Sequence, residues 1–301
     1  MSSVRVSETV KIAIASDSEA VVMLVLKNLL RQDCRIGTLC VEIYQDKSLT
    51  MADTLSYAQA MTYNRHIVLP QIDLSGQEAL LNAQVLVIGM GGLGCPAAQL
   101  LCTSGVGKIT LVDDDIVASS NLPRQWLYSH AQVGQYKVHA ARDRLHALNP
   151  DCRISVISQR LNDEDLAALI QQHDMVLDCT DNPASRLQIN AQCYQQQRVL
   201  VSAASIRFEG QLQVVDPRQQ SPCYQCVSRL FSAQALSCNE AGIFAPVVSA
   251  IGTQQAHIAL LMLMGIEVLP PGQLMTYDGL SLTWQSFSVP ADPQCPVCQP
   301  Q

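Results

Sequence analysis

The sequence predicts an α/β protein of the Rossmann-like class: a mainly parallel sheet with helices on both faces, extended by antiparallel strands and by a four-cysteine zinc knuckle. Three observations carry this prediction. Strand-like and helix-like segments alternate from about residue 52, the segment "VLVIGMGGLGCP" contains a Gly-x-Gly-x-x-Gly turn, and strand pairs and paired cysteines follow towards the carboxyl end. The chain of 301 residues, 48% hydrophobic and 15% charged, is long enough for one large domain or two modest ones.

The parallel part of the sheet takes its strands from short apolar segments separated by helical ones. Strands are expected at 85–89, 108–113, 153–158, 175–179 and 199–203. Helices are expected between them, over 136–149, 163–173 and 184–197. Antiparallel strands are expected in "EGQLQVVDP" and on both sides of the Asp278-Gly279 turn signal in "QLMTYDGLSLTWQSFSV".

Residues 1–50 differ from the rest and form an amino-terminal extension of unknown role, whereas residues 51–301 form the nucleotide-binding domain. Within the extension, "KIAIAS", "SEAVVMLVLKNLLRQD" and "CRIGTLCVEIY" have the patterns of a strand, a helix and a strand. No motif lies in them. A start of translation at Met51, without any extension, is an equal alternative.

Composition excludes several classes of function. The formal net charge of −7 argues against a nucleic-acid partner, which requires a basic face. The long apolar segment "APVVSAIGTQQAHIALLMLMG" is interrupted by polar residues, so no membrane span is expected. No secretory signal is recognised at the amino end, which places the protein in the cytoplasm, and the twelve cysteines are expected to be reduced there.

The glycine turn predicts a nucleotide site. Its members are Gly89, Gly91, Gly92 and Gly94. Such a turn points backbone N–H groups and the positive end of a helix at phosphate oxygens. The next strand ends in Asp113, about 20 residues beyond the last glycine, where an acid bonds ribose hydroxyls. The turn alone does not decide between NAD and ATP.

The segment after that strand favours chemistry at phosphorus. It supplies two acids, two amides and two cations: Asp113, Asp115, Asn121, Gln125, Arg124 and Lys137. Hydride transfer has no use for two cations beside the phosphates, whereas attack at a phosphorus builds negative charge that Arg and Lys stabilise. The alternative is that Arg124 and Lys137 are ordinary surface charges.

A further acid, in "VLDCTDN", is predicted to hold Mg²⁺ against the nucleotide phosphates. Both Asp178 and Asp181 come from the same edge of the sheet, and Asp181, which is nearer the turn, is the choice for the metal. Alternatively, one of the two merely caps the helix that begins near Ala184.

Two Cys-x-x-Cys pairs predict a structural Zn²⁺ site. Cys223 with Cys226 and Cys295 with Cys298 offer four thiolates, which complete a tetrahedral site and leave no open position. A redox pair of the thioredoxin type and coincidence are the alternatives, but neither accounts for two such pairs. Cys95, Cys102, Cys179 and Cys193 are expected to be buried and unreactive.

The motifs together resemble a known family. "YNRH", "GMGGLG", "DDD", "SNLPRQ", "VGQYK" and "LDCTDN", in this order and spacing, are similar to the MoeB/ThiF/HesA family of ATP-dependent activators of ubiquitin-like sulfur carriers. The resemblance covers roughly residues 55 to 300. It implies adenylation of the carrier's carboxyl-terminal Gly-Gly carboxylate, with release of pyrophosphate. Pro123 and His66 stand where the family usually has glutamine.

The resemblance also implies roles for individual residues. Asn121, Arg124 and Lys137 are expected to hold ATP phosphates, Asp113 the ribose and Asp181 the Mg²⁺. Arg65, in "YNRH", is expected to reach into the site of a partner subunit, which implies a homodimer. In relatives that pass on sulfur or form thioesters, a cysteine near the position of Cys238 is the acceptor, although adenylation itself needs no protein nucleophile.

Different segments of the sequence resemble two branches of the family, which serve different carriers. "CVSRLF", "ALSCNEAG" and "AASIRFEGQ" resemble the branch that serves the small subunit of molybdopterin synthase, whereas "GIEVLPPGQLMTYDG" and "CPVC" resemble the branch that serves the thiamine pathway. The first branch is the prediction and the second its alternative. An NAD-dependent oxidoreductase and a non-catalytic scaffold are the rivals from other classes.

Overall fold

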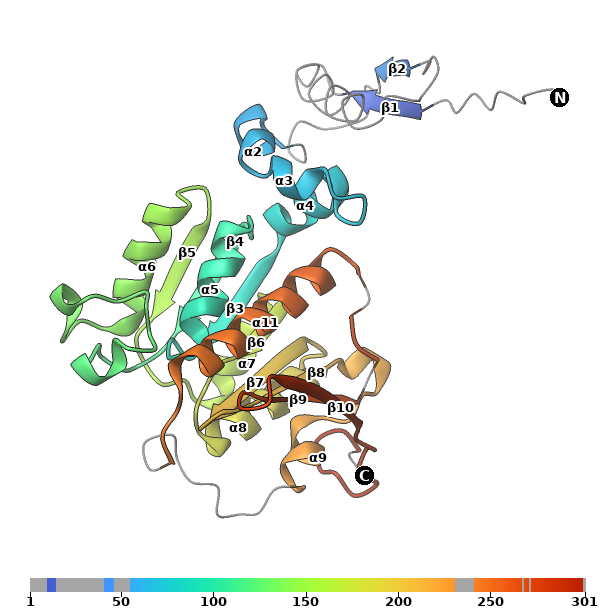
Figure 1. Ribbon diagram of the computed structural model, residues 1–301. Helices are drawn as coiled ribbons and strands as arrows, with labels where there is room; N and C mark the ends of the chain where they lie inside the picture. The colour runs from blue at the N-terminus through green and yellow to red at the C-terminus, as the bar shows by residue number, and fades with distance from the viewer. Residues whose placement is uncertain are drawn as a thin grey trace. The chain divides into compact units, whose positions relative to one another are not determined.

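A computed structural model describes residues 10–14, 41–45, 55–230, 241–266, 268–270 and 272–299 of the chain (Figure 1). The chain divides into two compact units, Met1–Glu78 and Ala79–Gln301. The predicted division after residue 50 falls outside the described residues. Every strand predicted for the parallel sheet lies in the second unit.

The first unit contains a parallel strand pair and short helices. β1 (Val10–Ile14) pairs in parallel with β2 (Val41–Gln45), where the sequence pattern predicts strands. α2 (Tyr57–Thr62) begins at a capping box, because Ser56 Oγ accepts from the Gln59 N–H and the Ser56 N–H donates to Gln59 Oε1. The helices α3 (Asn64–Ile67) and α4 (Asp73–Asn82) follow, and α4 continues into the second unit.

The second unit is built on an eight-stranded sheet with the order β10-β9-β8-β7-β6-β3-β4-β5. The parallel strands are β3 (Gln84–Ile88), β4 (Lys108–Val112), β5 (Arg153–Ile157), β6 (Met175–Asp178) and β7 (Val199–Ile206). The antiparallel extension is formed by β8 (Glu209–Val215), β9 (Gln273–Asp278) and β10 (Thr283–Ser288). Both the parallel and the antiparallel predictions are confirmed, with ends that differ by a few residues.

Helices cover both faces of this sheet (Figure 1). The longer ones are α5 (Gly94–Thr103), α6 (Lys137–Leu148), α7 (Asp163–Gln171), α8 (Pro183–Gln195) and α11 (Ala245–Leu263). The short ones are α9 (Tyr224–Ser228) and the 3₁₀ turns Ser119–Asn121, His130–Gln132 and Pro217–Gln219.

The side chains of β3 show how the two faces are filled. Val85 and Val87 belong to the core shared with α5, α6 and α11, whereas Leu86 and Ile88 belong to the core shared with α7 and α8. Successive side chains of a strand point to opposite faces, so a strand buried on both faces reads as a continuous apolar run. This explains why β3 shows no alternation in the sequence.

α11 is long and apolar enough to cross a membrane by length and composition alone. Half of its apolar window is buried inside the protein, and the helix packs against α5, β7 and β8. Gln255, at its centre, is fully buried and donates to the carbonyls of Asp178 and Val201 at 2.9 Å. α11 is therefore a core helix of the second unit.

Candidate active site

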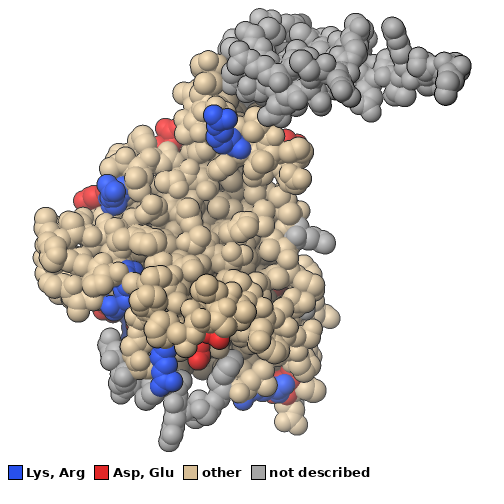
Figure 2. Space-filling model, in the orientation of Figure 1, with Lys and Arg blue, Asp and Glu red and all other residues tan. Residues whose placement is uncertain are grey.

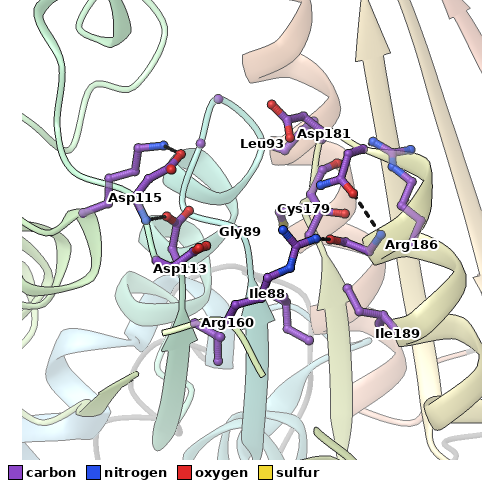
Figure 3. A pocket seen from close by; sticks show the side chains of 18 of the residues that line it. Ile88, Gly89, Leu93, Asp113, Asp115, Arg160, Cys179, Asp181, Arg186 and Ile189 are labelled. Carbon is purple, nitrogen blue, oxygen red and sulfur yellow. Dashed lines mark hydrogen bonds and ion pairs between the residues drawn. The ribbon is translucent and has the colours of Figure 1, made fainter. Parts of the chain in front are cut away.

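A polar cleft opens where the parallel strands β3, β4 and β6 end (Figure 3). Its volume is about 360 Å³, which lies within the range of small-molecule sites. Asp113 and Asp115 lie on one side of it, Asp181 and Arg186 lie on the other, and Gly89 lies between them. The structure thus brings together the residues that the sequence predicts at the carboxyl edge of the sheet.

The backbone shape of the glycine turn requires glycine at two positions, Gly89 and Gly94. Gly89 has a φ of 93°, and a Cβ placed there would meet the carbonyl oxygen of Cys179 at 2.7 Å. A Cβ on Gly94 would meet the carbonyl oxygen of Gly89 at 1.9 Å. Gly91, by contrast, has room around it and lines the cleft. Gly89 and Gly94 therefore set the turn, and α5 begins directly behind it.

Asp113 joins the turn to the neighbouring strand. Its carboxylate accepts from the N–H groups of Met90 at 2.6 Å and of Asp115 at 2.8 Å. Burial raises the pKa of Asp113, and the nearby Lys137 ammonium opposes that rise. The carboxylate is half-buried and lines the cleft. The position that the sequence assigns to ribose binding is therefore held rigidly at the end of β4.

The two predicted cations, Arg124 and Lys137, both line the cleft. The Lys137 side chain is only 7% exposed, and its Nζ lies 2.7 Å from Asp115 Oδ2, whose side chain is 69% exposed. Arg124 Nη1 donates to the carbonyl oxygen of Ser120 at 2.9 Å. An ordinary surface lysine is not buried in this way, so the alternative of two incidental surface charges does not describe Lys137.

The two predicted amide side chains that follow β4, Asn121 and Gln125, have different surroundings. Asn121 Oδ1 accepts from the Ala118 N–H at 3.1 Å, which closes the 3₁₀ turn after β4. Gln125 is 3% exposed and lines the cleft, and its Oε1 has no hydrogen-bond partner among the described residues. Buried polar atoms in proteins are nearly always paired, so Gln125 Oε1 is an acceptor without a partner at the wall of the cleft.

The acids that follow β6 are distinguished by their hydrogen bonds. Asp178 is fully buried, and its carboxylate accepts from the Thr180 N–H and O–H and from Ser202 Oγ. Asp181 is exposed at the cleft and makes no hydrogen bond or ion pair with the described residues. The free carboxylate oxygens of Asp181 suit a hard cation such as Mg²⁺, whereas both carboxylate oxygens of Asp178 already accept hydrogen bonds.

The helix cap at this position is Asn182 and neither aspartate. Asn182 Oδ1 accepts from the Ser185 N–H at 2.9 Å at the start of α8. The alternative in which Asp178 or Asp181 caps the helix is therefore wrong, because the capping oxygen must come from the residue that immediately precedes the first turn.

Two cationic residues of the cleft, Arg160 and Arg186, were not predicted from the sequence. Arg160, just beyond β5, lines the cleft and donates to Ser185 Oγ at 3.1 Å, and Arg186, in the first turn of α8, donates to the Thr180 carbonyl oxygen (Figure 3). Only their position in the sequence could have identified these two arginines, because each follows the carboxyl end of a predicted parallel strand.

Two predicted residues are not placed in the cleft. Arg65 is exposed on α3, which belongs to the first unit, whereas the cleft belongs to the second. His66, its neighbour, has Nδ1 3.0 Å from Gln77 Oε1. Cys238, proposed as a sulfur acceptor, lies outside the described residues.

The four predicted zinc ligands converge on one buried point. All four residues are buried, and their Sγ atoms lie within 4.8 Å of one another. Two of the Sγ pairs are 3.6 Å (Cys223 and Cys295) and 3.4 Å (Cys226 and Cys298) apart. A tetrahedron with zinc–sulfur bonds of about 2.3 Å has edges of about 3.8 Å, whereas a disulfide requires about 2 Å. The cysteines therefore fit Zn²⁺ with four thiolate ligands and no open position.

The other cysteines in the described residues are free and buried. Among them, Cys95, Cys102, Cys179 and Cys193 lie in the apolar cores, as the sequence predicts. Burial raises the pKa of the Cys95 thiol to about 12. These thiols are packing residues.

Comparison with known proteins shows the family of the chain. The model of the ThiF family matches residues 63–297. The chain belongs to the ThiF family. It is 47% identical over 244 residues to the molybdopterin-synthase adenylyltransferase of Escherichia coli K12, a match that covers 81% of this chain and 98% of the relative. It is 43% identical over 238 residues to the sulfur carrier protein ThiS adenylyltransferase of the same organism, with 79% and 94% covered.

Solved structures of this family's fold are also similar. The crystal structure of Escherichia coli MccB with ATP superimposes with a TM-score of 0.66 at 24% identity and covers 74% of this chain and 69% of that one. The structure of PaaA has a TM-score of 0.67 at 20% identity and covers 90% and 81%. At these identities the likeness shows the shared α/β fold.

Proposed function

We propose that this ThiF-family protein adenylates the carboxyl-terminal Gly-Gly carboxylate of a small ubiquitin-like sulfur carrier, with ATP as the donor and pyrophosphate as the leaving group. The carrier assigned to it is the small subunit of molybdopterin synthase, which places the reaction in molybdenum cofactor biosynthesis. Support comes from similarity to molybdopterin-synthase adenylyltransferases, over 81% of this chain and 98% of theirs, and from the residues of the cleft.

One observation carries the proposal: a cleft at a glycine turn that is lined by four cationic side chains. They are Arg124, Lys137, Arg160 and Arg186. A redox dinucleotide needs no such set, whereas a triphosphate under attack gains charge on its leaving group, which fixed cations stabilise. This favours nucleotidyl transfer over an NAD-dependent oxidoreductase, and the retained cations argue against a non-catalytic scaffold.

In the proposed step, a carboxylate oxygen of the carrier attacks the α-phosphorus of ATP. The new bond joins that oxygen to phosphorus, the bond from the α-phosphorus to the bridging oxygen of pyrophosphate breaks, and no proton is transferred. Asp113 would hold the ribose, while Asn121, Arg124 and Lys137 would hold the phosphates, beside the N–H groups of Gly91 and Gly92. The protein contributes position and charge rather than a covalent nucleophile.

The same proposal assigns Mg²⁺ to Asp181, where the ion would neutralise phosphate charge when bound. Asp115 keeps Lys137 in place through their ion pair. Arg65 would act in the site of a second copy of the chain, so the enzyme is proposed to be a homodimer. Cys238 is the proposed acceptor if the carrier is passed on as a thioester.

The cytoplasm is the proposed compartment, and neither a nucleic acid nor a membrane is among the proposed partners. On the face drawn in Figure 2, the charged side chains of the described residues are scattered and do not gather into a basic surface. Zn²⁺ on the four cysteines is proposed to be structural because its ligand set is complete.

The thiamine-pathway carrier remains the second candidate, since the chain is 43% identical to an adenylyltransferase of that kind. Exchange of labelled pyrophosphate into ATP separates the candidates. Purified protein is incubated with each carrier, and exchange is expected with the molybdopterin-synthase subunit. Exchange with the thiamine carrier alone would replace the assignment of the carrier. No exchange with either carrier, in protein that binds nicotinamide cofactor, would refute adenylation.

A further inference from the structure

One cation of the cleft, Arg160, comes from the end of β5, which β4 separates from the strand that precedes the glycine turn. Its Nη2 donates to Ser185 Oγ of α8 at 3.1 Å, so the Arg160 side chain extends across the cleft towards that helix (Figure 3). Arg160 is exposed and makes no ion pair with any described residue. Its guanidinium is therefore held in place by a neutral hydroxyl, and no carboxylate of the described residues neutralises it.

Apolar side chains line the same part of the cleft. Ile88 and Val112 are the last residues of β3 and β4, and they share one buried cluster with Leu166 of α7 and Ile189 of α8. Arg160 reaches α8, the helix that also carries Ile189, so the guanidinium and the apolar cluster lie on the same face of the sheet. This part of the cleft thus offers a flat ligand both an apolar surface and a planar cation.

The order of the strands indicates which part of a nucleotide would occupy this region. The glycine turn follows β3, Asp113 follows β4 and Arg160 follows β5, and these strands are neighbours in that order. The Asp113 N–H also donates to the carbonyl oxygen of Ile157, the last residue of β5, at 3.2 Å. A nucleotide with its phosphates at the glycine turn and its ribose at Asp113 would therefore place its base at the end of β5, beside Arg160.

The chemistry of a guanidinium suits a nucleotide base. Both groups are planar, and arginine stacks on aromatic faces through cation–π attraction and flat contact. Aliphatic side chains against the opposite face of the base exclude water from it. A purine has two fused rings and a pyrimidine has one, so such a site gains more contact with a purine. A lysine in the same place would supply the charge without the plane.

We propose that Arg160 covers the purine base of the bound nucleotide: its guanidinium stacks on one face of the base, and Ile88, Val112 and Ile189 contact the other. This assignment rests on the proposed function, because it takes ATP as the nucleotide. Arg160 is then the residue that makes the cleft prefer purine over pyrimidine nucleotides. Its charge still adds to the positive field of the cleft.

The test variant is Arg160→Lys, which keeps the charge and removes the plane. Calorimetry on the purified full-length protein, without any carrier, gives the affinities for ATP, CTP and inorganic tripolyphosphate. The wild type is expected to bind ATP more tightly than CTP. In Arg160→Lys the affinity for ATP is expected to fall by about 3- to 30-fold and the preference over CTP to shrink, because the stacking contact is lost. The affinity for tripolyphosphate should stay within about 2-fold of wild type, since the charge is retained.

The matched control is Arg124→Lys, the same substitution at a cleft arginine that is assigned to the phosphates. An ammonium does not reproduce the paired hydrogen bonds of a guanidinium to phosphate oxygens. The affinities for ATP, CTP and tripolyphosphate are therefore expected to fall together in Arg124→Lys. The preference for ATP over CTP should remain that of the wild type, because the base contact is untouched.

Equal losses of ATP and tripolyphosphate affinity in Arg160→Lys would overturn the base contact and assign Arg160 to the phosphates. An unchanged preference for ATP over CTP in Arg160→Lys would also overturn it, as would a wild-type protein that binds ATP and CTP equally well. The binding assay contains no carrier, so its outcome is separate from that of pyrophosphate exchange. A wild-type protein that prefers ATP through Arg160 but shows no exchange would refute the proposed function and support the base contact.

Discussion

The nucleotide cleft and the cysteine site of the second unit are built in opposite ways. In the cleft, polar groups differ widely in exposure: the Lys137 side chain is 7% exposed and that of Asp115 is 69% exposed. At the cysteine site all four ligands are buried, and their sulfurs face one another. An active site must leave donors facing a substrate, whereas a structural metal is stable when its ligands are saturated.

This contrast teaches where each site should respond to mutation. Loss of a group that faces the cleft removes an interaction with the substrate and leaves the fold intact. Loss of a group at the cysteine site uncovers a buried charge and releases the carboxyl-terminal segment, which is also tied to the end of α9 by the ion pair between Arg229 and Asp292. The experiments below test this division, from the largest expected effect to the smallest.

The largest effect is expected from Cys226→Ala at the metal site. Because metal binding is coupled to folding, losing the zinc should lower the free energy of unfolding by more than about 4 kcal/mol. Zinc content and urea unfolding measure this. Cys193→Ala, in the same core but not a ligand, is the control. Full zinc occupancy in Cys226→Ala would show that the four thiolates do not act together.

Next in size is the loss of activity in Arg124→Ala. Removing one stabilising charge from a transition state typically costs about 10²- to 10³-fold, so pyrophosphate exchange should fall by that factor while unfolding is unchanged. Arg142→Ala is the control, since Arg142 is paired with Asp143 on α6 and does not line the cleft. Undiminished exchange in Arg124→Ala would contradict the proposed mechanism.

A smaller effect is expected from Asp181→Asn. An amide is a weaker ligand for Mg²⁺ than a carboxylate, so half-maximal exchange should require about 10-fold more Mg²⁺. Asp165→Asn, in the first turn of α7, serves as the control. An unchanged Mg²⁺ requirement would assign the metal to another ligand.

The smallest effect concerns His173, which belongs to neither site. Its ring bridges the Leu169 carbonyl oxygen of α7 and Thr110 Oγ1 of β4, both at 2.8 Å. Burial is the main cause that lowers the pKa of His173 below its ordinary value. The unfolded chain therefore takes up the proton first, and the stability that neutral His173 provides is lost as the pH falls below about 6.5.

Thermal unfolding between pH 7.5 and 5 measures whether the stability falls with the pH as predicted. The wild-type protein should lose stability over this range, and His173→Gln should lose less. A steeper loss of stability in His173→Gln than in wild type would contradict the prediction that neutral His173 stabilises the folded protein. Changes at the zinc thiolates are common to both proteins and cancel in the comparison.

Much of the second unit was predictable because its signals are local. Short apolar runs bounded by turns indicated β3 to β7, and the Asp278-Gly279 signal indicated the β9–β10 hairpin. Glycine is required in the turn because a Cβ at Gly94 would overlap a backbone oxygen. The spacing of the two Cys-x-x-Cys pairs indicates a metal site from the sequence alone. The residues of the glycine turn and of the metal site follow from these signals.

Tertiary structure alone decided how neighbouring groups share their hydrogen bonds. Asp178 and Asp181 are three positions apart and chemically alike, yet the Asp178 carboxylate accepts hydrogen bonds from Thr180 and Ser202, whereas Asp181 lines the cleft. Arg160 and Arg186 line the cleft because β5 ends and α8 begins beside it, and Asn190 reaches the Tyr224 N–H because α8 packs on α9. A sequence specifies which groups a chain carries, whereas which of them remain unpaired depends on contacts between distant segments, which have no local signal.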